Sequence, residues 1–164
     1  MTNGGLATDN TYVFAVDSSN VYYFAAGAAN DDLVPCNTST VPCTLGTALA
    51  TNVFLPGQIA AYGGQVYWWA GKSGDPLVRC AATGCSNTPT TVVNVVGSLT
   101  QLFVDASGIY WITDAGLLNK CPLSGCPGTG PTTITSGISG AKFLKVQGSS
   151  AYWLGSSAVY RIGL

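Results

Sequence analysis

The sequence predicts an all-β fold, a β-propeller of four four-stranded blades. A tyrosine followed by a second aromatic residue recurs along the chain, and the repeat length of about 40–45 residues is typical of four-stranded blades. The pairs are Tyr22-Tyr23, Tyr67-Trp68, Tyr110-Trp111 and Tyr152-Trp153. The chain contains no Glu and is rich in Val, Thr, Tyr, Trp and Gly, which favours strands over helices. Aligning the repeats on the aromatic pairs gives a regular series of short apolar segments.

The first two strands of each repeat flank a short turn. The expected first strands are 12–16, 58–61, 101–104 and 142–146. The expected second strands, which carry the aromatic pairs, are 21–24, 66–69, 109–112 and 151–154. Apolar residues on both faces of the second strands are typical of strands sandwiched between neighbouring blades. The turns contain Asp, Asn, Ser and Gly, and Asp17 and Asp105 are expected to cap two of them.

The outer strands complete each blade. The expected third strands are 33–36, 77–80, 118–121 and 159–162, and the expected fourth strands are 47–53, 90–96 and 132–135. The last repeat has no fourth strand of its own, but residues 5–9 (Gly-Leu-Ala-Thr-Asp) resemble residues 48–52 (Ala-Leu-Ala-Thr-Asn). We therefore expect the N-terminal strand to complete the last blade and cover its edge.

A single domain, residues 1–164, is expected. Its blades are approximately 11–53, 54–97, 98–137 and 138–164 plus 4–10. The chain can close these four blades into a ring by itself, or two chains can join head to tail into an eight-bladed ring. Closure within one chain is the preferred interpretation, with half of an eight-bladed dimer as the alternative.

The charge content limits the possible partners. Charged residues make up 8% of the chain and the net charge is −1, so little repulsion opposes self-association or binding to another extracellular protein. Six cations spread along the chain do not form a strong phosphate-binding face, which argues against a nucleic-acid partner. No apolar run approaches the length of about 18 residues needed for a membrane span.

Six cysteines form three close pairs, each just after a third strand. The pairs are Cys36/Cys43, Cys80/Cys85 and Cys121/Cys126. Local disulfides are favoured over a zinc site, because zinc-binding pairs are usually closer in sequence and need a second pair nearby. Disulfides indicate an oxidising compartment, so we expect a secreted or cell-surface protein, extracellular or periplasmic.

The third repeat resembles a known family. Its segment Ile109-Tyr-Trp-Ile-Thr-Asp114 is similar to the repeat of the YWTD propellers of lipoprotein-receptor ectodomains, with one residue inserted before Thr-Asp. The run Cys121-Pro-Leu-Ser-Gly-Cys126 resembles secreted bacterial β-propeller repeat proteins that carry a Tyr-Trp strand and a cysteine hairpin in each blade. The Thr-Asp half of the YWTD signature survives only at Thr113-Asp114. The resemblance implies a propeller fold, and function must be argued from sites.

Several residues are candidates for ligand binding. Trp69 follows a shared aromatic pair and is the aromatic expected at the surface. Three cations occupy equivalent third-strand positions: Arg79, Lys120 and Arg161. They could bind an anionic ligand as a partial cationic ring, but we favour a role as solvated residues that protect the strand edge. Asp31 and Asp32 lie in the longest expected loop, 25–33, and provide too few oxygens for a calcium site alone. The Tyr-aromatic pairs themselves are interpreted as blade-to-blade core rather than as a ligand stripe.

Catalysis has little support in the sequence. The chain has neither His nor Glu, so the usual general bases are missing, and no phosphate-binding motif or nucleophile elbow is present. No catalytic residue, metal or cofactor is predicted. We expect a secreted, non-enzymatic module for binding or extracellular assembly, for example a filament or surface-layer subunit. The alternative is a carbohydrate-binding lectin, which would need the same pocket in several blades.

Overall fold

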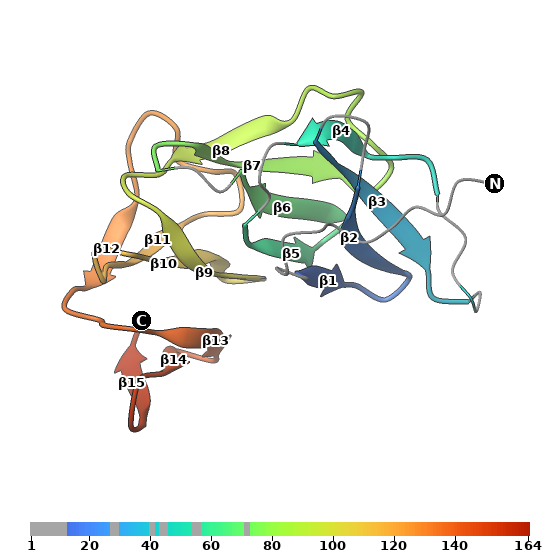
Figure 1. Ribbon diagram of the computed structural model, residues 1–164. Coiled ribbons are helices and arrows are strands. Elements are labelled where there is room, and N and C mark those ends of the chain that lie inside the picture. Colours follow the sequence, from blue (N-terminus) through green and yellow to red (C-terminus); the bar gives the residue numbers. More distant parts are fainter. Residues whose placement is uncertain (1–12, 27–29, 40–41, 43–45, 54–56, 71–72) are drawn as a thin grey trace.

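The computed structural model describes residues 13–26, 30–39, 42, 46–53, 57–70 and 73–164. These residues form antiparallel strands β1 to β15 and no helix (Figure 1). Within these ranges, no helix is long and apolar enough to cross a membrane. The expected all-β fold is confirmed, and each of the fifteen strands predicted from residue 12 onward is present.

Each repeat forms one antiparallel sheet, and each sheet is one blade. Blade 1 contains β1 (Phe14–Val16), β2 (Asn20–Ala26), β3 (Asp31–Asn37) and β4 (Ala50–Val53). Blade 2 contains β5 (Ile59–Tyr62), β6 (Gln65–Trp69), β7 (Pro76–Ala81) and β8 (Thr90–Asn94). Blade 3 contains β9 (Leu99–Asp105), β10 (Gly108–Thr113), β11 (Leu118–Cys121) and β12 (Thr132–Thr135). Within each blade the strands follow chain order, as the repeat predicts.

Blade 4 has three strands among the described residues. They are β13 (Lys142–Gln147), β14 (Ser150–Leu154) and β15 (Val159–Gly163). The segment predicted to complete this blade, residues 5–9, lies outside the described residues.

The blades are arranged around their inner strands. β1 packs against β5, β5 against β9, and β9 against β13. Figure 1 shows the four sheets following one another in chain order, with blade 1 and blade 4 at the two ends of the series. Among the described strands, no comparable packing joins β13 back to β1. The described residues therefore form an arc of four blades.

The core consists of the side chains between successive blades. In each second strand, alternate residues face opposite neighbours. Tyr22 and Phe24 of blade 1 share one apolar cluster with Trp68 of blade 2, and Tyr67 of blade 2 shares the next with Trp111 of blade 3. These side chains are 0–6% exposed. The interpretation of the Tyr-aromatic pairs as blade-to-blade core is confirmed for Tyr22 and for the pairs of blades 2 and 3, whereas Tyr23 is only half-buried.

The prediction of a long loop at residues 25–33 is wrong. β2 continues to Ala26 and β3 begins at Asp31, with Ala25 opposite Asp32 and Ala26 opposite Asp31. Cross-strand pairing thus extends two residues beyond the aromatic segment, because small apolar Ala side chains do not interrupt the ladder. Asp31 and Asp32 accordingly lie on a strand.

Candidate functional site

A pocket of 570 Å³ lies where the inner turns of blades 1 and 2 approach each other. We call it the turn-end pocket. Its lining includes Asp17, Asn20, Tyr22, Tyr62, Gly63 and Gly64. Its volume is within the range of small-molecule sites, roughly 300–1,000 Å³. A carboxyl and an amide therefore line one cavity of ligand size. Tyr62 borders this cavity, and its side chain also packs against the cluster between blades 2 and 3.

The blade 1 side of this pocket is organised by Asp17. One carboxylate oxygen, Oδ1, accepts hydrogen bonds from the backbone N–H groups of Ser19 (2.7 Å) and Asn20 (2.8 Å). The other, Oδ2, accepts a hydrogen bond from the hydroxyl of Tyr22 at 2.7 Å. This is the local capping expected of Asp at a turn, and it fixes the position of the carboxylate at the pocket wall.

These contacts shift the ionisation of both partners. Burial, followed by the hydrogen bond to Asp17, raises the pKa of the Tyr22 hydroxyl to about 12. Burial alone would raise the pKa of the Asp17 carboxyl, but the hydrogen bonds from Tyr22, Ser19 and Asn20 outweigh it and lower that pKa below its ordinary value. At neutral pH the pocket therefore contains an ionised carboxylate beside a neutral phenol.

The blade 2 side departs from the repeat. Tyr62 stands where blades 1 and 3 carry Asp17 and Asp105. Gly63 and Gly64 form the two-residue turn after Tyr62 with φ of +58° and +72°, a backbone that strongly favours glycine. A Cβ added at either glycine would meet no atom within 4 Å. The glycine turn thus leaves open space beside Tyr62. This pocket was not predicted from the sequence, although the presence of Tyr62 where other repeats carry Asp is a visible signal.

Three smaller pockets recur at equivalent places between successive blades. Each is bordered by the second aromatic residue of a Tyr-Trp pair, and their volumes are 220, 140 and 240 Å³ in chain order. The bordering tryptophans are Trp68, Trp111 and Trp153. The residues opposite them on the third strand are Val78, Asn119 and Tyr160, respectively. Because the second wall changes from apolar to amide to aromatic, these pockets do not share one recognition chemistry.

The tryptophans of these inter-blade pockets are largely covered. Trp68 is 2% exposed, Trp111 1% and Trp153 9%. Trp153 is stacked on Tyr160, with ring centroids 5.8 Å apart. Ring faces that already pack against protein are not available to stack on a ligand, so the turn-end pocket is the better candidate site.

The surface position predicted for Trp69 is wrong. Its side chain is 5% exposed and lies in the cluster between blades 2 and 3. Trp69 follows Tyr67 by two residues, so both side chains point to the same face of β6. The indole N–H donates a hydrogen bond to the carbonyl of Asp75 at 3.2 Å. Trp69 is therefore a core residue rather than a ligand contact.

The two adjacent acids, Asp31 and Asp32, are half-buried on β3. Oδ1 of Asp32 accepts a hydrogen bond from the backbone N–H of Asn52 at 3.0 Å, which connects β3 to β4. Among the described residues, no group of three or more acidic, His or Cys side chains is placed to hold a metal ion.

The equivalent cations lie on three different blades, each opposite the first tyrosine of a pair. Arg79 is opposite Tyr67, Lys120 opposite Tyr110 and Arg161 opposite Tyr152. Lys120 Nζ lies 5.1 Å from the centroid of the Tyr110 ring, and Arg161 Cζ lies 5.9 Å from that of Tyr152. Arg79 Nη1 donates a hydrogen bond to the carbonyl of Leu123. Each cation thus makes local contacts that do not require an anionic ligand.

Two of the predicted disulfides are present. Cys80 is bonded to Cys85 and Cys121 to Cys126, with Cα–Cα distances of 5.4 and 5.8 Å. Cys36 is also disulfide-bonded, and Cys43, its predicted partner, lies outside the described residues. The disulfides indicate an oxidising environment.

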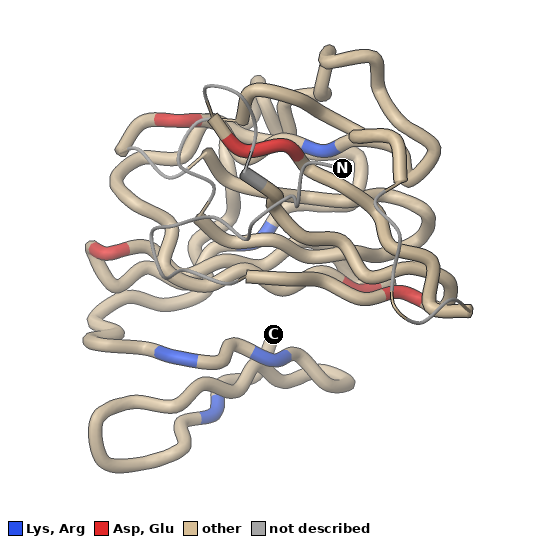
Figure 2. Tube along the Cα trace, turned by 45° about the vertical axis from the view of Figure 1, so that its right-hand side comes forward, with Lys and Arg blue, Asp and Glu red and all other residues tan. Residues whose placement is uncertain are grey.

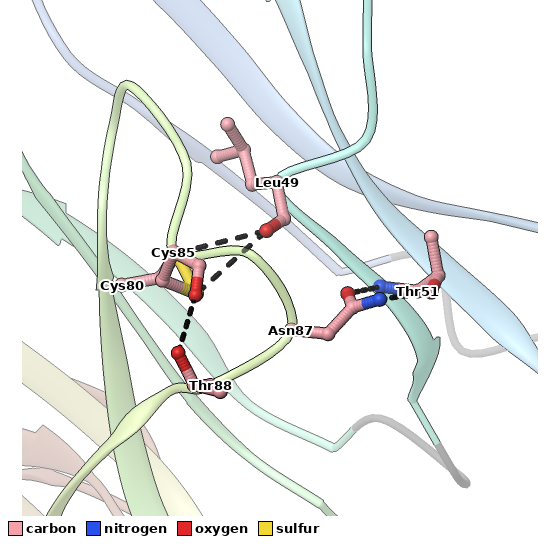
Figure 3. The surroundings of a disulfide bond; sticks show 6 residues. All are labelled: Leu49, Thr51, Cys80, Cys85, Asn87 and Thr88. Carbon is pink, nitrogen blue, oxygen red and sulfur yellow. Dashed lines mark hydrogen bonds between the residues drawn. A yellow bond between two sulfur atoms is a disulfide. The ribbon is translucent and has the colours of Figure 1, made fainter.

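The cysteine hairpins connect neighbouring blades. Figure 3 shows the hairpin of blade 2 beside Leu49 and Thr51 of blade 1. The sulfurs of Cys80 and Cys85 lie 3.8 and 3.7 Å from the Leu49 carbonyl oxygen. Asn87 exchanges two hydrogen bonds with Thr51, accepting from its backbone N–H (2.7 Å) and donating to its hydroxyl (2.8 Å). This arrangement gives the hairpin a structural role in holding blade 2 against blade 1.

No family model and no curated protein matches the chain. Solved structures do resemble it in fold. The computationally designed Ika4 protein has a TM-score of 0.63 at 11% identity, covering 98% of this chain and 96% of that one. The N-terminal domain of Nup159 has a TM-score of 0.56 at 11% identity, covering 99% of this chain and 47% of that one.

A protein from Lactobacillus plantarum has a TM-score of 0.56 at 16% identity, covering 98% of this chain and 57% of that one. The chain therefore spans about half the length of these two natural structures. At such identities the similarity shows the β-propeller-like fold alone.

Proposed function

We propose that this chain is a secreted, non-enzymatic β-propeller module that acts by binding, with the turn-end pocket as its ligand site. The observation that carries the proposal is the pocket itself, which combines Tyr62 with the capped Asp17 carboxylate and the Asn20 amide in 570 Å³. An aromatic surface with a few fixed polar groups is the usual composition of a small-molecule site.

The chemistry of the pocket supports binding rather than catalysis. Asp17 is the carboxylate at its wall, and its two oxygens already accept three hydrogen bonds from its own blade. Its lowered pKa keeps it ionised, so it is a poor proton donor, and its local contacts make it a poor base. The sequence has no His or Glu to take these roles elsewhere.

The disulfides support an extracellular or periplasmic location for the module. They persist in oxidising compartments, and two cysteine hairpins strengthen contacts between neighbouring blades. A link to secreted bacterial repeat proteins and to YWTD propellers is part of this proposal and depends on the sequence pattern of the third repeat.

A carbohydrate is the second candidate for the ligand, which would make the module a lectin. The carboxylate of Asp17 and the amide of Asn20 suit the hydroxyl groups of a sugar, and Tyr62 borders the same pocket. The three inter-blade pockets do not extend this argument, because their tryptophans are covered.

A saturation-transfer NMR screen with neutral mono- and disaccharides and short peptides tests the proposal. The unmodified chain is compared with Tyr62→Ala, which truncates a residue at the border of the pocket. The matched control is Gln147→Ala, at the equivalent and exposed turn position of blade 4. We expect signals that disappear in Tyr62→Ala and persist in the control. Sugar signals would support the lectin, and peptide signals alone would support a protein-binding module. Signals that survive in Tyr62→Ala would place the site elsewhere.

A further inference from the structure

The three internal blade interfaces follow one rule. The first aromatic of each pair and the residue two positions later face the next blade, and the second aromatic of that blade faces back. Tyr110 and Ile112 of blade 3, for example, share a cluster with Trp153 of blade 4. These three side chains are 0–9% exposed. We call the face toward the next blade the forward face and the face toward the preceding blade the backward face. The forward face of each blade thus fits the backward face of the next blade.

The backward face of blade 1 has no partner blade among the described residues. Phe14 is opposite Tyr23 on the neighbouring strand, and Val16 is opposite Val21, which places these side chains on one face. Phe14 is 66% exposed and Val16 is 51% exposed. Tyr23 occupies the position of Trp68, Trp111 and Trp153 in the other blades. We call Phe14, Val16 and Tyr23 the first-blade end face.

The forward face of blade 4 is equally uncovered among the described residues. Leu154 is 39% exposed and its cross-strand neighbour Val159 is 67% exposed. Tyr152 lies two residues before Leu154 and so shares this face. Tyr152 and Leu154 correspond to Tyr110 and Ile112 of blade 3, which are almost completely buried against blade 4. We call Tyr152, Leu154 and Val159 the last-blade end face.

The two end blades carry opposite charges. Residues 11–53 contain Asp17, Asp31 and Asp32 and no Lys or Arg. Residues 138–164 contain Lys142, Lys145 and Arg161 and no Asp. Figure 2 shows blue segments and no red ones in the C-terminal sheet. Opposite charges favour contact of a blade 4 with a blade 1 and disfavour contact between two copies of the same end blade.

We propose that the first-blade end face of one copy of this chain packs against the last-blade end face of a second copy, so that two chains form an eight-bladed ring. This goes beyond the proposed ligand site and does not depend on it. The contact repeats the internal interfaces, with Tyr23 of one copy in the place that Trp153 takes against Tyr110 and Ile112.

The arrangement favours a second copy of this chain as the partner that covers the two end faces. Both end faces belong to the same chain, and the first and last blades stand at opposite ends of the arc (Figure 1). Since no comparable packing joins β13 to β1 among the described strands, each face is free to accept the complementary face of another molecule. In two copies related by a twofold axis, both end faces of each chain are covered by the other chain, so the assembly is closed.

The solution mass tests the assembly directly. Size-exclusion chromatography with light scattering on the full chain should give about twice the chain mass of 16.8 kDa. A species of single-chain mass at micromolar concentration, or a species larger than a dimer, would overturn the proposal.

Two variants test whether the last-blade end face forms the contact. Leu154→Asp puts a charge on the last-blade end face and should convert the dimer into monomers. The matched control is Val96→Asp, at a valine that is 88% exposed but lies between blades 2 and 3, outside both end faces. The control should remain a dimer. Circular dichroism of both variants establishes that they are folded. Dimers in folded Leu154→Asp, or monomers in folded Val96→Asp, would refute the assignment of this face.

A mixing experiment tests the head-to-tail orientation. Phe14→Asp and Leu154→Asp should each be monomeric alone, because every interface then contains one altered face. In a mixture, one interface of a mixed pair has both native faces, so dimers of one chain of each variant should reappear. Dimers in Phe14→Asp alone would indicate contact between two last-blade end faces and would exclude the proposed ring.

Discussion

The hydroxyl of Tyr22 donates a 2.7 Å hydrogen bond to Oδ2 of Asp17, which connects the packed second strand of blade 1 to the turn that precedes it. Blade 3 builds the same connection through one more residue. There the hydroxyl oxygens of Tyr110 and Ser107 lie 2.9 Å apart, and Ser107 donates to Asp105 at 2.5 Å. In blades 1 and 3 the first tyrosine of the pair therefore has two roles, since its ring fills the blade interface and its hydroxyl supports the inner turn.

Replacing Tyr22 with Phe should remove the turn support while keeping the ring. We expect a loss of about 1 kcal/mol in the free energy of unfolding near neutral pH, the usual contribution of one such hydrogen bond. The raised pKa of Tyr22 adds a pH dependence. Its contribution is fully present below the ordinary tyrosine pKa of 10.0 and is lost as the pH rises through about 12.

Urea unfolding of the native chain and of Tyr22→Phe at several pH values checks this prediction. The difference between the two should shrink in the alkaline range, because only the native chain loses the protonated Tyr22. All other residues are the same in both proteins, so their contributions cancel in the difference. A difference that is independent of pH up to the alkaline limit would contradict the assigned role of the hydroxyl.

The Cys80–Cys85 bond should stabilise the chain mainly by constraining the unfolded state, and it also keeps the hairpin closed beside blade 1. The double variant Cys80→Ala, Cys85→Ala opens a loop with a sequence separation of 5 and should cost about 2 kcal/mol. Guanidinium unfolding should show a lower midpoint with little change in slope. Thr51→Ala should lower the free energy of unfolding less in this double variant than in the native chain, because the hairpin that positions Asn87 is already loosened. Fully additive effects would show that the disulfide and the Asn87–Thr51 contact act independently.

The blades were predictable because the repeat specifies each of the first three strands four times and the fourth strand three times. A period-two alternation also shows which aromatic residues are buried, and it places Trp69 on the same face as Tyr67. The burial of Trp69 was not predicted, because Trp69 follows the shared pair and was compared with the residues after the other pairs rather than with Tyr67. The turn-end pocket was not predictable in the same way, because it depends on how the turn of Asp17 meets the turn of Tyr62 across two blades. Local sequence shows that Tyr62 breaks the repeat but does not show what lies beside it.

Trp69 offers a direct contrast between a core role and a ligand role. Trp69→Ala should lower the free energy of unfolding by about 3–5 kcal/mol, the usual cost of deleting a buried large aromatic side chain. Phe143→Ala, at an aromatic residue that is 72% exposed, should change it by about 0.5 kcal/mol or less. Chemical denaturation of both variants provides the comparison. Equal small effects would mean that Trp69 is not packed as the structure shows.

Gly116 should be intolerant of any side chain because it connects blades 3 and 4 at close range. Its φ is +74°, and an added Cβ would lie 2.2 Å from the carbonyl oxygen of Ile138. The backbone N–H of Ile138 donates to the Gly116 carbonyl at 3.1 Å, so neither segment can move away without losing that bond. Gly116→Ala should therefore cost at least about 2 kcal/mol through backbone strain and steric clash.

Gly128→Ala is the matched control for this prediction. Gly128 is exposed, and a Cβ there would meet no atom within 4 Å. Its φ lies outside the positive range, so the change should be neutral or slightly stabilising, because Ala restricts the unfolded chain more than Gly does. Thermal and guanidinium unfolding of the two variants should separate them clearly. If Gly116→Ala were as stable as Gly128→Ala, the backbone at Gly116 would have to relax, and the close contact between blades 3 and 4 would not be a determinant of their packing.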